Sequence, residues 1–253
     1  MSPRSSNERP APGEEHNPGP ATSPRQAATV ILLRGGAEEL ELLLVRRTPQ
    51  ARFMGGVWVF PGGAVDPADA SPTGFAAAGD GDPLEKLALR AAAARELREE
   101  AAIVLVDPGE LVEFSRWITP AEVRTRFDTH FFLAPLPAGQ EPKVDGEECV
   151  DLGWFTPAQA LEAHRNEQIV LVFPTIKHLE QLQAFASVEA LLTYARGRTV
   201  QPIQPRVVVE GEVARVLLPG EPGYDDPQPG TEMPNRIPGP PTGPNRIPGP
   251  PTG

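Results

Sequence analysis

Residues 84–101 form an unbroken run of Ala, Leu, Glu, Arg and Lys, with no glycine or proline inside it. These residues have high helix propensity, and Asp82 and Pro83 precede them as a helix cap and a first-turn proline. The segment therefore predicts one long helix. The apolar segments on both sides of it are short and β-rich, so the chain has to combine this helix with a sheet.

Strand-like segments precede and follow the helix at residues 28–33, 40–45, 57–60, 103–106, 128–134 and 150–155. Residues 66–83 between them have the composition of an irregular loop. Three shorter helices are expected over residues 158–165, 175–186 and 187–196, and a hairpin over 207–209 and 213–218. This order predicts an α+β fold in which helices flank a mixed sheet, in an α/β/α sandwich-like arrangement.

Prolines are concentrated at the two ends of the chain. More than half of the 32 prolines lie in residues 1–26 and 220–253, which contain few large apolar side chains. The last part is a tandem decapeptide, residues 234–243 and 244–253, whose frequent prolines favour an extended polyproline-like tail. We expect one folded domain over residues 27–219 between two disordered tails. A proline-rich ligand for a groove on another protein is the alternative function for the repeat.

Charge and cysteine content narrow the class of protein. The formal net charge is −11, the opposite sign from that of most nucleic-acid-binding proteins. The single cysteine, Cys149, cannot form an internal disulfide, and the longest apolar run, residues 101–106, is too short to span a bilayer. We expect a cytoplasmic protein with neither nucleic acid nor membrane as a partner. If an acidic protein handles an anionic substrate, it needs local cations, a metal or arginines, to bind it.

One face of the long helix is strongly acidic. Glu96, Glu99 and Glu100 fall within an arc of about 100° on a helical projection, with Arg95 at its edge. Carboxylates this close repel one another, and a bound divalent cation would relieve the repulsion; oxygen-rich sites suit Mg²⁺ or Mn²⁺. The alternative is a solvated face with local Arg–Glu pairs. The apolar residues gather on another side of the helix: Leu87, Ala94, Leu97 and Ala101.

This helix and the loop before it resemble the Nudix box. The residues that carry the resemblance are Phe60-Pro61-Gly62-Gly63 and Arg95-Glu96-Leu97-Arg98-Glu99-Glu100-Ala101-Ala102-Ile103. The resemblance implies a metal-dependent hydrolase of diphosphate bonds, with Glu96, Glu99 and Glu100 as metal ligands. It also implies that Arg95 orients these carboxylates, that the Gly63 carbonyl completes the coordination, and that Glu100 or Glu99 is the catalytic base.

The match departs from the family pattern at three places. The spacing between Gly63 and Arg95 is longer than in the family, and we place the insertion in loop 66–83, where a loop can absorb it. Leu87 stands where the family has an auxiliary glutamate, and Ala102 stands where it has a glycine. Alanine is acceptable at a helix end provided that its φ stays negative.

A second resemblance concerns the substrate. Residues 43–48, Arg52, Gly56 and residues 60–63 follow the motif of coenzyme A diphosphatases within the Nudix family. Residues 117–120, 126–129 and 131–134 are similar to the branch related to the peroxisomal coenzyme A diphosphatases of animals, which also has an insertion in its Nudix box. The resemblance implies coenzyme A or an acyl-CoA as substrate.

The same region contains a cluster of arginines that could bind the 3′-phosphate of coenzyme A: Arg46, Arg47 and Arg52. Because side chains alternate along a strand, Arg46 and Arg47 point to opposite faces, which leaves Arg52 as the best candidate.

Other polar residues have weaker signals. Glu147 and Glu148 lie where Nudix enzymes often supply another carboxylate, although an exposed turn explains them equally well. His130 and Cys149 have the pattern of buried core residues. The rival to an enzyme is a Nudix-fold module that binds a nucleotide-like ligand without hydrolysing it, for which Leu87 is the only support.

Overall fold

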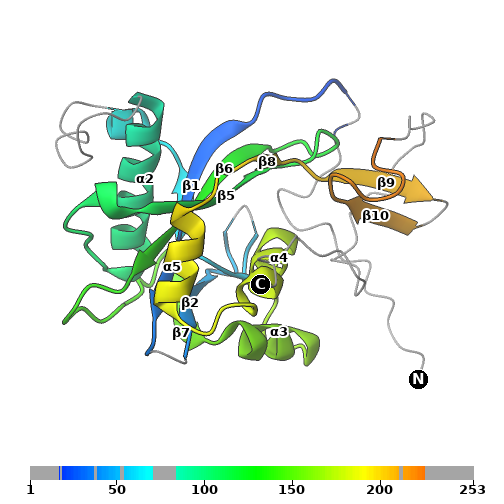
Figure 1. Cartoon of the computed structure of the whole chain (residues 1–253). Coiled ribbons are helices and arrows are strands. Elements are labelled where there is room, and N and C mark those ends of the chain that lie inside the picture. The colour runs from blue at the N-terminus through cyan, green and yellow to red at the C-terminus, as the bar shows by residue number, and fades with distance from the viewer. Residues whose placement is uncertain are drawn as a thin grey trace.

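The computed structural model describes residues 17, 19–36, 39–51, 54–70, 84–210 and 213–225. Its centre is an eight-stranded sheet with the order β3-β2-β1-β6-β5-β8, in which β4 also pairs with β1 and β7 with β2 (Figure 1). The strands are β1 (Arg25–Arg34), β2 (Glu41–Arg47), β3 (Trp58–Val59), β4 (Gly62–Ala64), β5 (Val112–Ile118), β6 (Phe127–Pro135), β7 (Cys149–Phe155) and β8 (Pro202–Ile203).

The sheet is mixed. Strand β1 pairs in parallel with β6 and antiparallel with both β2 and β4. At the far edge β8 adds a parallel pairing to β5. A mixed sheet between helices confirms the α+β fold class expected from the order of segments.

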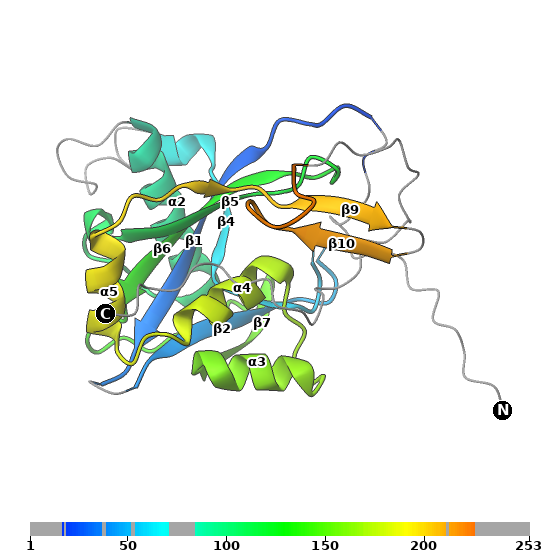
Figure 2. The same cartoon turned by 45° about the vertical axis from the view of Figure 1, so that its right-hand side comes forward.

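Helices cover both faces of this sheet. Helix α2 (Leu84–Ala101) packs on one face, and α3 (Pro157–Arg165), α4 (Phe173–Leu182) and α5 (Val188–Arg196) lie on the other (Figures 1 and 2). The alternation of β1 explains the two cores: Val30 and Leu32 pack towards α2, whereas Ile31 and Leu33 pack towards α4 and α5. None of the described helices is both long and apolar enough to cross a bilayer.

The helix starts follow sequence signals. Thr156 and Gln159 form a capping box before α3, and the Ser187 side chain caps α5. Helix α4 begins at Phe173 and ends at Leu182, which places it earlier than the expected 175–186, because its first turn accommodates Pro174.

The expected strand at residues 103–106 was wrong. Ile103 is buried, but Val104 and Val106 are 52% and 92% exposed, and the segment pairs with no strand. The strand after α2 is instead β5, which follows a short 3₁₀ helix, η2 (Pro108–Glu110). The charged residues Glu113 and Arg116 within β5 obscured its apolar alternation.

The end of α2 also corrects an assumption about Ala102. Its φ is 55°, in the left-handed region, rather than negative. The Ala102 N–H donates to the Arg98 carbonyl at 3.0 Å, which is the hydrogen bond of a left-handed helix cap. Glycine adopts this conformation without strain, and this backbone requirement explains why the family pattern has a glycine at this position.

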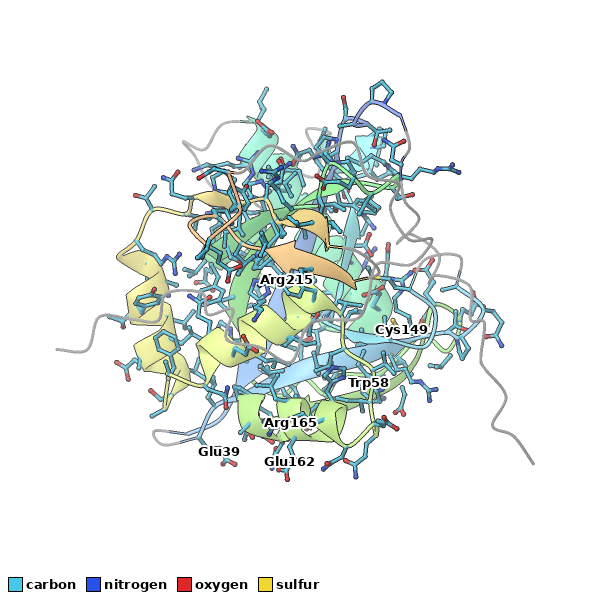
Figure 3. All side chains as sticks on the ribbon, turned by 90° about the vertical axis from the view of Figure 1, so that its right-hand side faces the viewer. Glu39, Trp58, Cys149, Glu162, Arg165 and Arg215 are labelled. Carbon is cyan, nitrogen blue, oxygen red and sulfur yellow. The ribbon has the colours of Figure 1, made fainter. Side chains whose placement is uncertain are left out.

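Two strands form a separate hairpin, β9 (Arg206–Glu210) and β10 (Val213–Leu217). Figures 1 and 2 show it beyond the β8 end of the main sheet. In Figure 3 Arg215 marks this hairpin above α4. The first part of the expected loop 66–83 contains a 3₁₀ helix, η1 (Pro67–Ala70), and residues 71–83 lie outside the described part of the chain.

Candidate active site

Glu100 is the buried member of the acidic face. Its side chain is only 2% exposed, and its Oε2 accepts a hydrogen bond from the backbone N–H of Gly62 at 2.9 Å. Its Oε1 lies 3.5 Å from the Arg47 guanidinium. Burial raises the pKa of the Glu100 carboxyl to about 7, while the Gly62 N–H and the Arg47 charge favour the ionised form.

Strand β4 lies against this face of α2, and its glycines allow a close approach. A Cβ on Gly63 would lie 2.4 Å from Glu96 Oε1, and a Cβ on Gly62 would lie 2.4 Å from Thr29 Oγ1. A larger residue at Gly63 would therefore displace the Glu96 carboxylate of α2, whereas a larger residue at Gly62 would collide with β1. This explains physically why two adjacent glycines precede the acidic helix.

Arg95 links the acidic face to the loop before the helix. Its guanidinium donates to Glu96 Oε1 at 2.8 Å and to Glu99 Oε2 at 3.0 Å. It also makes two bonds of 3.0 Å to Asp69 in η1 and one to the Ala64 carbonyl. The hydrogen bond to Asp69 is the main reason that the pKa of Arg95 is raised. Arg95 thus contacts two of the three glutamates, and the role that the resemblance implies for it, orienting these carboxylates, stays a prediction.

Asp69 was missed by sequence reasoning. It lies in the segment with loop composition, yet it is 5% exposed and receives two hydrogen bonds from Arg95. No sequence signal distinguishes Asp69 from Asp66, the carboxylate that directly precedes Pro67 and is exposed.

Mutual repulsion among carboxylates is the feature that suits a cation. Burial raises the pKa of Glu96, and the charges of Glu99 and Glu148 act in the same direction. The charges of Glu96 and Glu148 likewise raise the pKa of Glu100. A hard divalent ion with oxygen ligands would offset this repulsion, so the donor set fits Mg²⁺ or Mn²⁺.

The present side-chain arrangement does not itself form a coordination sphere. Within the described residues, no three acidic, histidine or cysteine side chains converge closely enough to hold a metal ion. Arg95 supplies the positive charge between Glu96 and Glu99 instead. A cation would have to compete with Arg95 for these carboxylates.

A cleft of about 600 Å³ lies on the other side of β4. Gly62, Gly63 and Arg47 form the wall shared with the acidic face, and Arg25 at the start of β1 contributes a second cation. The remaining wall is largely apolar or hydroxylated and includes Ala27, Thr29, Val59, Phe60, Phe127, Thr129, Phe131, Val172, Pro174 and Thr175. A concave site with a few placed polar groups is typical of small-molecule binding.

The predicted arginine cluster is only partly assembled here. Arg47 lies on the α2 side of β2 and contacts Glu100, whereas Arg46 continues the alternation of Leu42 and Leu44 towards the opposite core. Arg52 lies outside the described residues. Sequence reasoning missed Arg25, because a lone arginine before a strand carries no recognisable pattern.

The polar residues with weaker sequence signals differ in their exposure and in their contacts. Glu147 and Glu148 are both exposed in the turn before β7, and the charge of Glu148 raises the pKa of Glu96 and of Glu100. His130 is 9% exposed and bonds Glu113 at 2.7 Å, as expected of a satisfied core histidine. Cys149 is fully buried, and burial raises the pKa of its thiol, which disfavours the thiolate.

A family comparison agrees with this geometry. Residues 23–173 match the model of the NUDIX domain, which covers more than half of the chain. The chain belongs to the NUDIX family. The matched range begins just before β1 and ends at the start of α4, so α5 and the β9–β10 hairpin lie beyond it.

Known NUDIX proteins resemble the chain over most of its length. The acyl-coenzyme A diphosphatase NUDT19 of Homo sapiens is 26% identical, with 82% of each chain covered, and that of Gallus gallus is 25% identical over 80% of each. The uncharacterized Nudix hydrolase NudL of Enterobacter sp. (strain 638) is 33% identical over 56% of this chain and 62% of its own.

A solved structure also matches. The NUDIX hydrolase from Alicyclobacillus acidocaldarius superposes with a TM-score of 0.61 at 28% identity, covering 68% of this chain and 96% of that one. The fold is therefore the NUDIX fold, in agreement with the sequence-based expectation.

Proposed function

We propose that the protein is a metal-dependent Nudix hydrolase that cleaves the diphosphate linkage of a nucleoside-diphosphate-linked substrate, and that coenzyme A or an acyl-CoA is the preferred one. The observation that carries the proposal is the burial of Glu100 against the Gly62 N–H and Arg47, because both of these residues line a cleft that also contains Arg25. This arrangement combines a desolvated carboxylate with cations for an anionic substrate.

The metal ligands that we propose are Glu96, Glu99 and Glu100, with the Gly63 carbonyl and Glu148 as further oxygen donors. A bound Mg²⁺ or Mn²⁺ would neutralise the diphosphate and lower the pKa of an attacking water. Arg95 then holds the carboxylates in place through its bonds to Glu96 and Glu99.

Glu100 is our preferred general base. Its carboxylate is held by the Gly62 N–H beside the cleft, and a bound divalent ion would lower its metal-free pKa of about 7 and keep it ionised to accept a proton. Glu99 is the second candidate, but its side chain is 49% exposed and pairs with Arg95 and Arg98. Glu148 is the rival from outside the helix, and Glu147 the less favoured member of that turn.

The substrate assignment is supported by the relatives named acyl-coenzyme A diphosphatase and by the arginines near the cleft. The 3′-phosphate of coenzyme A needs a cation that is not already paired. Arg47 pairs with Glu100, so we propose Arg25, which lines the cleft, and Arg52, which the substrate motif favours and which lies outside the described residues, with Arg46 as the less favoured third.

The experiment is a substrate screen with Mg²⁺ and Mn²⁺. Coenzyme A, dephospho-CoA, nucleotide sugars, NADH and dinucleotides are compared, and the products are separated by chromatography. We expect phosphopantetheine and adenosine 3′,5′-bisphosphate from coenzyme A. Arg52→Ala and Arg25→Ala should each reduce the preference for coenzyme A over dephospho-CoA while hydrolysis persists. If other diphosphates are hydrolysed but coenzyme A is not cleaved, the substrate assignment is wrong and the proposal of a diphosphate hydrolase is retained.

The alternative function is a NUDIX-fold module that binds a nucleotide-like ligand without hydrolysing it. Its one favourable observation is Leu87, which is buried where the family has an auxiliary glutamate. Ligand binding by calorimetry with no product under any metal condition would support this alternative.

A further inference from the structure

The substrate cleft continues into a second, smaller cavity. This cavity has a volume of about 160 Å³, and seven residues line both spaces. Met54, Thr129, Phe131 and Pro174 are among the shared residues, so the two volumes form one connected site. We call the smaller volume the apolar annex.

The annex differs chemically from the cleft. None of the described residues that line it is charged, whereas the cleft contains Arg25 and Arg47. Its far wall includes Trp117, Phe173 and Val207. A ligand that fills both spaces would thus place its anionic part in the cleft and an uncharged, apolar part in the annex.

The β9–β10 hairpin provides one wall of the annex. Val207 of β9 and Val216 of β10 are directly opposite each other in the antiparallel register, so both side chains are on the same face of the hairpin. They are 2% and 7% exposed, and both line the annex. The hairpin lies beyond residues 23–173, so this wall is added to the NUDIX domain by the C-terminal part of the chain.

An unused donor lies in the same wall. The Trp117 indole nitrogen is buried and has no hydrogen-bond partner among the described residues. Buried N–H groups are normally paired, so an acceptor oxygen on a ligand would satisfy it. A hydrocarbon chain attached through a carbonyl group combines such an acceptor with an apolar end.

We infer that the annex binds the acyl chain of a thioester substrate and that the Val207–Val216 pair limits the length of that chain. The inference rests on the proposed function, because it places the diphosphate of an acyl-CoA in the adjoining cleft. An apolar cavity of about 150 Å³ accommodates benzene, so the annex fits on the order of six carbon atoms. Each methylene buried there should increase kcat/KM about fourfold.

The first test is the dependence of kcat/KM on chain length, measured with coenzyme A and its acetyl, butanoyl, hexanoyl and palmitoyl thioesters in saturating Mg²⁺. We expect kcat/KM to increase up to about six carbons and to gain nothing beyond that length. Val207→Phe should lower the ratio of kcat/KM for hexanoyl-CoA over coenzyme A at least tenfold.

Two further variants separate pocket filling from misfolding. Val216→Leu adds a single methylene on the opposite strand and should lower the ratio about fourfold. Val208→Phe is the matched control, since alternation along β9 turns Val208 away from the annex, and it should retain the wild-type ratio. A ratio unchanged by Val207→Phe and Val216→Leu, or no chain-length dependence in the wild type, would overturn the inference.

A binding measurement keeps the inference separate from the substrate assignment. 1-Hexanol is titrated into the full chain without metal, and the indole N–H resonance of Trp117 is followed by NMR, with Trp117→Phe to assign it. We expect a saturable shift in the wild type that is lost in Val207→Phe. A shift with no diphosphate cleavage in coenzyme A or any of its thioesters would support ligand binding in the annex and exclude coenzyme A and acyl-CoA as substrates. If there is neither a shift nor a chain-length dependence, the annex does not bind an acyl chain and the inference is wrong.

Discussion

The backbone nitrogen of Gly62 lies 2.9 Å from Glu100 Oε2, and this hydrogen bond joins α2 to the glycine-rich strand at the wall of the cleft. The contact spans two segments of the Nudix box that the sequence separates by a long insertion. It fixes the most buried carboxylate of the acidic face beside two residues, Gly62 and Arg47, that line the cleft. The first two predictions concern this carboxylate.

Glu100→Gln should reduce kcat on the preferred diphosphate substrate by at least about 10²-fold in saturating Mg²⁺, because the amide can neither accept a proton nor bind a cation as strongly. The amide oxygen can still accept the Gly62 N–H, so circular dichroism should show an intact fold. Glu162→Gln on the exposed face of α3 is the matched control and should retain full activity (Figure 3). Wild-type turnover by Glu100→Gln would exclude Glu100 from the site.

The stability difference between Glu100→Gln and the wild type should depend on pH when divalent ions are absent. The folded-state pKa of Glu100 is raised from 4.5 to about 7, so the folded state binds this proton more tightly than the unfolded state. The wild type therefore loses stability relative to the variant as pH rises from 4.5 to 7, and the difference is constant above that range. Melting temperatures of both proteins between pH 4.5 and 8 provide the measurement. A pH-independent difference would contradict the assignment.

Ala102→Gly should stabilise the protein. The left-handed backbone costs an alanine about 1–2 kcal/mol, and the entropy lost by glycine offsets part of this, so we expect a gain of roughly 0.5–1 kcal/mol. Thermal unfolding should show an increase in melting temperature of about 1–4 °C. Ala101→Gly, one residue earlier in the buried helix, is the control and should lower the melting temperature.

Asp69→Asn should weaken the contact that holds Arg95 beside the proposed metal ligands Glu96 and Glu99. The amide loses the charge opposite Arg95, and we expect a loss of about 1–3 kcal/mol of stability, since Arg95 is partly exposed. Arg95 would then pair more strongly with Glu96 and Glu99. The Mg²⁺ concentration for half-maximal activity should consequently rise several-fold. Asp66→Asn, an exposed neighbour, is the control. An unchanged Mg²⁺ requirement would show that Arg95 does not compete with the cation.

Residues just outside the proposed 27–219 domain make contacts that a truncation should reveal. The Thr22 hydroxyl donates to the Arg124 carbonyl at 3.0 Å, and the Tyr224 hydroxyl donates to the Gln204 carbonyl at 2.7 Å. We expect residues 17–225 to melt as the full chain does, because the removed ends contain little apolar surface. Residues 27–219 should melt several degrees lower. Equal melting of the two fragments would place the domain boundary at 27–219.

The sequence by itself determined the helix, the acidic face and the fold class. Residues 84–101 contain no helix breaker, so local propensity was sufficient to predict α2 with both ends correct. The fixed spacing of Glu96, Glu99 and Glu100 on a helix placed them on one side without any tertiary information. The Nudix resemblance rests on the same local pattern, and the family match confirms it.

Only the tertiary structure decided which of these residues is buried and what surrounds it. Helical spacing cannot distinguish Glu100 at 2% exposure from Glu99 at 49%, because that difference comes from the packing of α2 against β4. The bonds of Arg95 to Asp69, and the closing of the annex by Val207 and Val216, likewise join segments far apart in the chain. Local sequence encodes backbone propensity and spacing, whereas burial and long-range contacts depend on how the elements pack, and no periodic pattern records that packing.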